Sequence, residues 1–217
     1  MVWIKICGIT NLEDAERIAG LNVDAMGFVL STNSPRRVDT SKAKEIMEVV
    51  RRRRNKISMV GVFVNEEIVK VLEDSEDLRL DYIQLSGDED KHYLKDLNDK
   101  SGDIKIIKSI RIKGRGQSYE AEPRGEIKKL EGCVDFILLD SYREDVYGGT
   151  GVSFDWNIIR DFYRGIPIIL SGGLDAENVK QAVSIVKPFG VDASSRLEIC
   201  PGKKDIYKVS RFIDVLK

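Results

Sequence analysis

The chain has 217 residues, of which 42% are hydrophobic and 33% are charged, and its formal net charge is −1. This length suits one domain with a sizeable core, and the balanced charge argues against nucleic acid as the main partner. No apolar run approaches the roughly 20 residues that a membrane-spanning helix needs, so we expect no membrane partner. The N-terminal residues lack the features of a signal peptide and the three cysteines are widely scattered, so we expect a cytoplasmic protein without a disulfide framework.

Short apolar segments rich in β-branched residues alternate with helix-like segments along the whole chain. The predicted strands are 2–6, 25–30, 57–64, 82–85, 104–110, 134–139, 166–170 and 190–192. The predicted helices are 11–20, 40–53, 66–74, 88–98, 121–131, 154–163, 175–187 and 205–216. Strict alternation predicts a parallel sheet with right-handed crossovers, and eight repeats favour a (β/α)8 barrel in which residues 1–217 form a single domain. An open doubly wound sheet is the alternative, but the segment 7–10 after the first strand carries no dinucleotide-binding glycine fingerprint.

Helix ends are signalled locally. Thr10 or Asn11 is expected to cap the first helix, and Ser153 and Asp175 are expected to cap later ones. A run of four arginines, 51–54, lies at the end of the second predicted helix. We interpret this run as a solvated helix end, where cations suit the helix dipole, with a contact to a partner as the alternative.

In a (β/α)8 barrel the loops after the strands build the active site, so residues at strand ends are the candidates for chemistry. Cys7 ends the first strand. A lone cysteine is usually a buried structural thiol. However, Lys5 lies two residues earlier and points to the same side of the strand, where its ammonium would favour a thiolate able to act as a base.

Asp140 ends the apolar sixth strand. Partial desolvation there would raise its pKa and let it donate a proton near neutral pH, with a helix cap or a loop ion pair as the alternative. The single histidine, His92, lies in a polar helix and is expected to be exposed. Cys133 and Cys200 are interpreted as structural. Proton transfer is therefore left to a thiol and carboxylates, and no residue cluster has the spacing of a metal site.

A loop that contains glycine and serine, 171–174, follows the seventh strand, and 190–195 forms the eighth strand with the serine-containing loop after it. Glycines there let backbone N–H groups approach an anion, and the loops after strands seven and eight form the recurrent phosphate site of these barrels. Tight turns with capping serines are the alternative. A third glycine cluster, 148–151, is interpreted as a flap over the substrate, with a solvent loop as the alternative.

Several motifs occur in a fixed order from end to end of the chain: Lys5-Ile6-Cys7-Gly8-Ile9-Thr10, Ser34-Pro35-Arg36-Arg37-Val38, Gln84-Leu85 with Gly87, Leu139-Asp140-Ser141, Ser171-Gly172-Gly173-Leu174, Val191-Asp192-Ala193-Ser194-Ser195 and Pro201-Gly202-Lys203-Lys204-Asp205. Together they resemble the phosphoribosylanthranilate isomerase family of tryptophan biosynthesis. Two positions depart from that family's pattern. Ser86 stands where the family usually has histidine, and Arg196 stands where it usually has glycine. Both bear on substrate affinity more than on the type of reaction.

The resemblance implies an Amadori rearrangement of a phosphorylated aminosugar, with no cofactor or metal. It assigns Cys7 as catalytic base and Asp140 as catalytic acid. The residues it assigns to substrate binding are Arg36 for the anthranilate carboxylate, Gln84 and Asp192, with Gly172, Gly173, Ser194 and Ser195 for the phosphate. A homodimer is compatible with the sequence, which does not define the oligomeric state.

Three other functions are weighed against this one. They are a bifunctional aminosugar isomerase, which resembles a two-aspartate design without need of Cys7, an indole-glycerol-phosphate synthase, and a ligand-binding barrel that has lost its activity.

Overall fold

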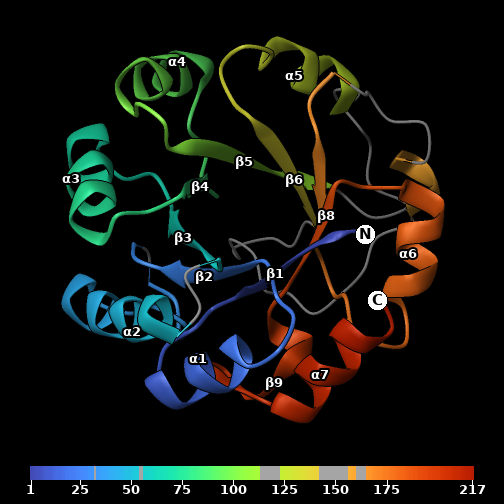
Figure 1. The fold of residues 1–217 in the computed structure, drawn as a ribbon. Coiled ribbons are helices and arrows are strands. Elements are labelled where there is room, and N and C mark those ends of the chain that lie inside the picture. Colours follow the sequence, from blue (N-terminus) through green and yellow to red (C-terminus); the bar gives the residue numbers. More distant parts are fainter. Residues whose placement is uncertain (32, 54–55, 113–122, 142–155, 160–164) are drawn as a thin grey trace.

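The computed structural model describes the chain except for residues 32, 54–55, 113–122, 142–155 and 160–164. Eight parallel strands form a closed barrel (Figure 1): β1 Trp3–Cys7, β2 Ala25–Val29, β3 Ser58–Phe63, β4 Tyr82–Leu85, β5 Lys105–Ile112, β6 Phe136–Ser141, β7 Ile168–Leu170 and β8 Gly190–Ala193. β1 pairs with β2 on one side and with β8 on the other. This closure confirms the predicted (β/α)8 barrel and excludes the open sheet.

The helices surround the strands (Figure 1): α1 Leu12–Ala19, α2 Thr40–Arg53, α3 Ile68–Leu78, α4 Lys91–Lys100, α5 Pro123–Lys129, α6 Val179–Val186 and α7 Ile206–Asp214. Where a helix was expected over 154–163, the structure describes a 3-10 turn, η1 Trp156–Ile159, and the rest of that segment lies outside the described residues. The 148–151 glycine cluster also lies outside them. A second 3-10 turn, η2 Ser195–Leu197, and a short antiparallel pair, β9 Glu198–Cys200 with β10 Lys203–Lys204, were not predicted.

Local sequence signals account for helix starts. Asn11 caps α1, because its side chain accepts a hydrogen bond from the backbone N–H of Asp14 at 2.9 Å. Asp175 accepts from the N–H groups of Glu177 and Asn178 in the turn before α6, but the N-cap of α6 is Asn178, so this helix begins later than predicted. Ser153 lies outside the described residues.

Two arginines at the end of α2 contact the neighbouring helices. Arg51 donates to the backbone carbonyls of Leu78 and Arg79, at 2.9 and 2.6 Å, where α3 ends. Arg53 pairs with Glu16 of α1 at 2.7 Å. Arg51 is half-buried, so a solvated end does not describe it, whereas the side chain of Arg53 is 60% exposed, as a solvated end predicts. Both arginines nevertheless tie α2 to a neighbouring helix.

The barrel interior changes from apolar to polar along its axis. At the N-terminal ends of the strands, four aromatic rings contact one another with centroid distances of 5.0–6.0 Å: Trp3, Tyr82, Phe136 and Phe189. Small and branched apolar side chains pack against this group, among them Ala25, Val60 and Ile169. Polar side chains gather at the C-terminal ends of the strands, so the chemistry is confined to that mouth of the barrel.

Candidate active site

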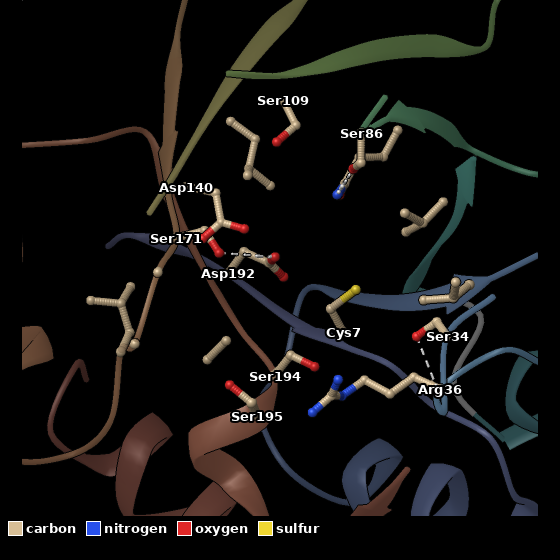
Figure 2. A pocket seen from close by; sticks show the side chains of 18 of the residues that line it. Cys7, Ser34, Arg36, Ser86, Ser109, Asp140, Ser171, Asp192, Ser194 and Ser195 are labelled. Atoms are coloured by element: carbon tan, nitrogen blue, oxygen red, sulfur yellow. Dashed lines mark hydrogen bonds between the residues drawn. The ribbon is translucent and has the colours of Figure 1, made fainter. Parts of the chain in front are cut away.

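One pocket opens at the C-terminal ends of the strands, and every site residue predicted from the sequence lines it. Figure 2 labels Cys7, Arg36, Asp140, Asp192, Ser194 and Ser195 among them. The predicted acid, base, carboxylate-binding arginine and phosphate loops come from five strands and the loops that follow them. Barrel closure is what brings them together, because Cys7 and Asp192 lie on the paired strands β1 and β8.

Asp140 lies at the end of β6 and is 7% exposed. Burial raises the pKa of its carboxyl to about 6, and the nearby charge of Asp192 acts in the same direction. The backbone N–H of Ser141, which donates to Asp140 Oδ1 at 2.8 Å, opposes the shift without cancelling it. The raised pKa expected from the sequence is therefore present, and the group can carry a proton near neutral pH.

Lys5 does not act on Cys7 alone. Its ammonium is completely buried and lies 2.8 Å from Asp192 Oδ1. Burial disfavours the charged form of Lys5, but the charges of Asp192 and Cys7 outweigh this and raise its pKa. Ser171 donates to the other oxygen of Asp192 at 3.4 Å. Lys5 and Asp192 thus form a buried ion pair, of which Asp192 lines the pocket.

The protonation state expected for Cys7 needs correction. Burial raises the pKa of its thiol, and this effect exceeds the opposing influence of the Lys5 ammonium. Asp192, which already neutralises Lys5, raises the pKa of Cys7 further. Without a bound ligand Cys7 is therefore a neutral thiol at neutral pH, not the thiolate predicted from the position of Lys5.

Arg36 is held in place by a carboxylate distant in sequence. Its guanidinium donates to both oxygens of Glu198, with Nε and Nη2 at 2.9 and 2.7 Å. The same carboxylate accepts from the buried ammonium of Lys204 at 2.9 Å, and Lys204 also donates to the backbone oxygen of Ser194 at 3.3 Å. Burial opposes ionisation of Glu198, but its two cationic partners hold its pKa below the usual value. Burial lowers the pKa of Lys204 despite Glu198.

A sharp backbone turn at Gly8 leaves room for the side chain of Arg36 in the pocket. Gly8 has a φ of +80°, and a Cβ added there would lie 2.8 Å from Cδ of Arg36 and 3.0 Å from Oγ of Ser194. Only glycine fits this position. Figure 2 shows the guanidinium of Arg36 beside Ser194 and Ser195.

Gln84 contributes an unpaired acceptor. Its amide nitrogen donates to Oγ of Ser86 at 3.0 Å, while its Oε1 is buried without a hydrogen-bond partner within the described residues. Both side chains line the pocket. Because a buried acceptor without a partner is unfavourable, this oxygen is suited to receive a hydrogen bond from a ligand.

The loop after β7 places a glycine against the acid. Gly172 has a φ of +92°, and a Cβ added there would lie 2.8 Å from the backbone N of Ser141 and 3.1 Å from Oδ1 of Asp140. Gly172 and Gly173 line the pocket together with Ser194 and Ser195. The two loops thus present backbone and hydroxyl groups on one side of the pocket, opposite Ser86 and Ser109 in Figure 2.

The remaining candidates lie elsewhere. His92 is exposed on α4, as expected, and Cys133 is buried. Cys200 is exposed on β9, which does not suit a buried structural thiol. Within the described residues, no group of histidine, cysteine and carboxylate side chains is placed to hold a metal ion, and no helix is long and apolar enough to cross a membrane.

Sequence reasoning missed Glu198 and the pairing of Lys5 with Asp192. The motif at 201–205 included Lys204 but gave it no role. The available signal was the Pro201-Gly202 dipeptide, which marks a turn and could have indicated the β9–β10 pair that carries Glu198 and Lys204.

A closed barrel with a polar pocket at the C-terminal mouth, containing a buried acid of raised pKa, defines a (β/α)8-barrel enzyme. The sequence profile of N-(5'-phosphoribosyl)anthranilate isomerase matches residues 4–215. The chain therefore belongs to the phosphoribosylanthranilate isomerase family.

Individual members of the family are similar to this chain over its full length. The N-(5'-phosphoribosyl)anthranilate isomerase of Caldanaerobacter subterraneus subsp. tengcongensis is 43% identical over 100% of this chain and 98% of its own. A crystal structure of a phosphoribosyl anthranilate isomerase in complex with reduced 1-(o-carboxyphenylamino)-1-deoxyribulose 5-phosphate is 35% identical, with a TM-score of 0.81 over 99% of this chain and 97% of that one. Monomers derived from the dimeric enzyme of Thermotoga maritima are 34% identical, with a TM-score of 0.79 over 99% and 98%.

Proposed function

We propose that the chain converts N-(5'-phosphoribosyl)anthranilate into 1-(2-carboxyphenylamino)-1-deoxyribulose 5-phosphate, an aldose-to-ketose isomerisation in tryptophan biosynthesis. Membership of the isomerase family supports this assignment. The observation that carries it is the presence, in one pocket, of a carboxyl of raised pKa, a buried thiol and a carboxylate-binding guanidinium.

The substrate has three features that the pocket can recognise. Its anthranilate carboxylate suits the guanidinium of Arg36, which Glu198 holds in a fixed orientation. Its phosphate suits the loops that carry Gly172, Gly173, Ser194 and Ser195. A ribose hydroxyl can donate to Oε1 of Gln84, and Asp192 can orient the substrate's amine or hydroxyl groups. Binding of the two anionic ends would fix the ribose between the acid and the base.

The reaction needs one acid and one base. Asp140 donates its proton to the ribose ring oxygen as the bond from that oxygen to C1′ breaks, and the nitrogen lone pair forms a protonated Schiff base. Cys7 then removes the proton from C2′, and the electrons of that C–H bond form the C1′–C2′ double bond while the nitrogen becomes neutral. The enolamine gains a proton at C1′ and loses the proton of its C2′ hydroxyl, which gives the ketone. The nitrogen supplies the electron push, so no cofactor or metal is needed.

The protonation states constrain this scheme. The productive form carries a proton on Asp140 and none on Cys7. However, the pKa of Asp140 is about 6 and the pKa of Cys7 lies above the usual value of a thiol. The productive form is therefore a minority of the free enzyme at every pH, and its fraction is constant between the two pKa values.

An assay with purified protein tests the function directly. Phosphoribosylanthranilate is fluorescent, and we expect its fluorescence to disappear without formation of an indole product. Formation of an indole product from the ketose, with no loss of the fluorescence, would indicate the synthase instead, and binding without turnover of either compound would indicate an inactive barrel. Turnover of an aminosugar substrate by the Cys7→Ser variant would favour the two-aspartate isomerase. Cys7→Ser and Asp140→Asn should each reduce kcat by orders of magnitude with an unchanged circular dichroism spectrum, and near-normal turnover would refute the role of the residue replaced.

We also infer that residues 1–217 form a single domain, that the protein is cytoplasmic, and that it is a homodimer. The pairing of β1 with β8, from opposite ends of the chain, supports the single domain. The dimeric state of the Thermotoga maritima relative supports the homodimer. Light scattering of the purified protein tests the last point, since a mass near 24.5 kDa would exclude a dimer.

A further inference from the structure

Arg196 lies at the edge of the pocket, beside the loops proposed to hold the phosphate. It follows Ser195 in η2 and lines the same pocket as Gly172 and Gly173. Its side chain is 48% exposed, so it lies where the pocket meets solvent. A cation in this place can reach an anion bound between the two loops.

Asp175 orients Arg196 from the other loop. Its Oδ2 lies 3.3 Å from Nη1 of Arg196, and its Oδ1 accepts from the backbone N–H groups of Glu177 and Asn178. Asn178 in turn donates to the backbone oxygen of Gly173 at 2.8 Å. A chain of hydrogen bonds therefore connects the glycine loop after β7 with the guanidinium after β8. A guanidinium has five N–H donors, so the contact of Arg196 with Asp175 is compatible with a contact to the phosphate as well.

Among the residues that the structure describes, the other cations in or near the pocket have different surroundings. Arg36 is 14% exposed and its Nε and Nη2 are bound to Glu198. Lys5 and Lys204 are buried and paired with Asp192 and Glu198. Arg111 comes from β5, whose neighbours in the barrel are β4 and β6 rather than the strands that carry the two loops.

We propose that Arg196 is a side-chain cation of the phosphate subsite and contacts the phosphate oxygens that face solvent. The proposal rests on the proposed function, because it requires the phosphate to lie between the two loops. The backbone and hydroxyl groups of those loops surround the inner side of the anion, and Arg196 covers its outer side. Because the guanidinium is half-exposed, its contribution is modest and depends on ionic strength.

The test compares Arg196→Met with a matched control, using inorganic phosphate as the probe. Arg211→Met is the control, because Arg211 is 49% exposed, pairs with a single carboxylate, Glu177, and lies on α7 away from the pocket lining. Both variants lose one positive charge. The dissociation constant is measured by calorimetry at low and at physiological ionic strength. For Arg196→Met we expect phosphate binding about fivefold weaker at low ionic strength, with a smaller difference in salt. For Arg211→Met we expect almost no change.

Kinetics give a second measurement. We expect Arg196→Met to raise KM for phosphoribosylanthranilate by a similar factor with little change in kcat, because the contact is made in both the ground state and the transition state. Equal phosphate affinity and equal KM in the two variants would overturn the role of Arg196 while the wild-type activity stands. A wild-type protein that neither binds phosphate nor turns over the substrate would overturn the proposed function itself, and this role with it.

Discussion

Replacement of Asp140 by asparagine should stabilise the fold while it abolishes catalysis. The carboxyl is buried, and its pKa is raised from 3.8 to about 6. The unfolded chain releases this proton more readily than the folded protein, so unfolding becomes more favourable as the pH rises from 3.8 to about 6. Asparagine has nearly the same shape, can accept from the same backbone N–H, and carries no charge.

The size of the effect follows from the two pKa values. Their difference of about 2 corresponds to about 3 kcal/mol in the free energy of unfolding above pH 7, and to about half of that at pH 5. Urea denaturation of wild type and Asp140→Asn at pH 5 and pH 8 measures these differences. Tryptophan fluorescence and far-UV circular dichroism should give coincident transitions if unfolding is two-state.

A control separates this effect from a general benefit of removing charge. Asp90 is the N-cap of α4, where asparagine is an equally good cap, so Asp90→Asn should change the free energy of unfolding by less than about 0.5 kcal/mol at either pH. The dependence on pH is the decisive observation. A stability gain for Asp140→Asn that is the same at pH 5 and pH 8, or no gain at all, would refute a desolvated carboxyl of raised pKa.

Three further predictions follow from the site. The value of kcat/KM should rise with pH up to about 6, the pKa of Asp140, remain level, and fall above the raised pKa of Cys7. A maximum confined below pH 6 would contradict the assignment of the lower pKa to Asp140 and the higher one to Cys7. Glu198→Gln should destabilise the fold at pH 7 by about 2–4 kcal/mol, because two cations lose their counter-charge, and raise KM. Because folding lowers the pKa of Glu198, the carboxylate stabilises the fold at pH values above its ordinary pKa of 4.5, and this stabilisation is lost as the pH falls through the pKa of the folded state. The free energies of unfolding of wild type and variant should therefore become equal in acid. Gly172→Ala should reduce kcat/KM at least about tenfold, because the added methyl group would contact Asp140. The control is Gly102→Ala, also at positive φ but with open space around it, which should lower the free energy of unfolding by about 1 kcal/mol and leave the activity unchanged. Normal activity in Gly172→Ala would show that the loop moves aside.

Several features could be predicted from the sequence because their causes are local. Alternation of apolar strands and amphipathic helices defines the eight repeated units, and the cap at Asn11 depends on residues within one helical turn. The raised pKa of Asp140 also has a local cause, since an acid at the end of an apolar strand is buried with that strand. The roles of Cys7, Arg36 and the phosphate loops remain predictions, which the placement of these residues around one pocket supports.

Other features depend on contacts between distant parts of the chain. Lys5 pairs with Asp192, 187 residues away, and Arg36 with Glu198, 162 residues away. Spacing along the chain could place Lys5 beside Cys7, but it could not show that a carboxylate from β8 neutralises the lysine and that burial raises the pKa of the thiol. The sequence alone thus determined the repeating units and the candidate acid. Barrel closure decided the charge state of Cys7 and the anchoring of Arg36, because charges interact through space and these partners meet only when β8 pairs with β1.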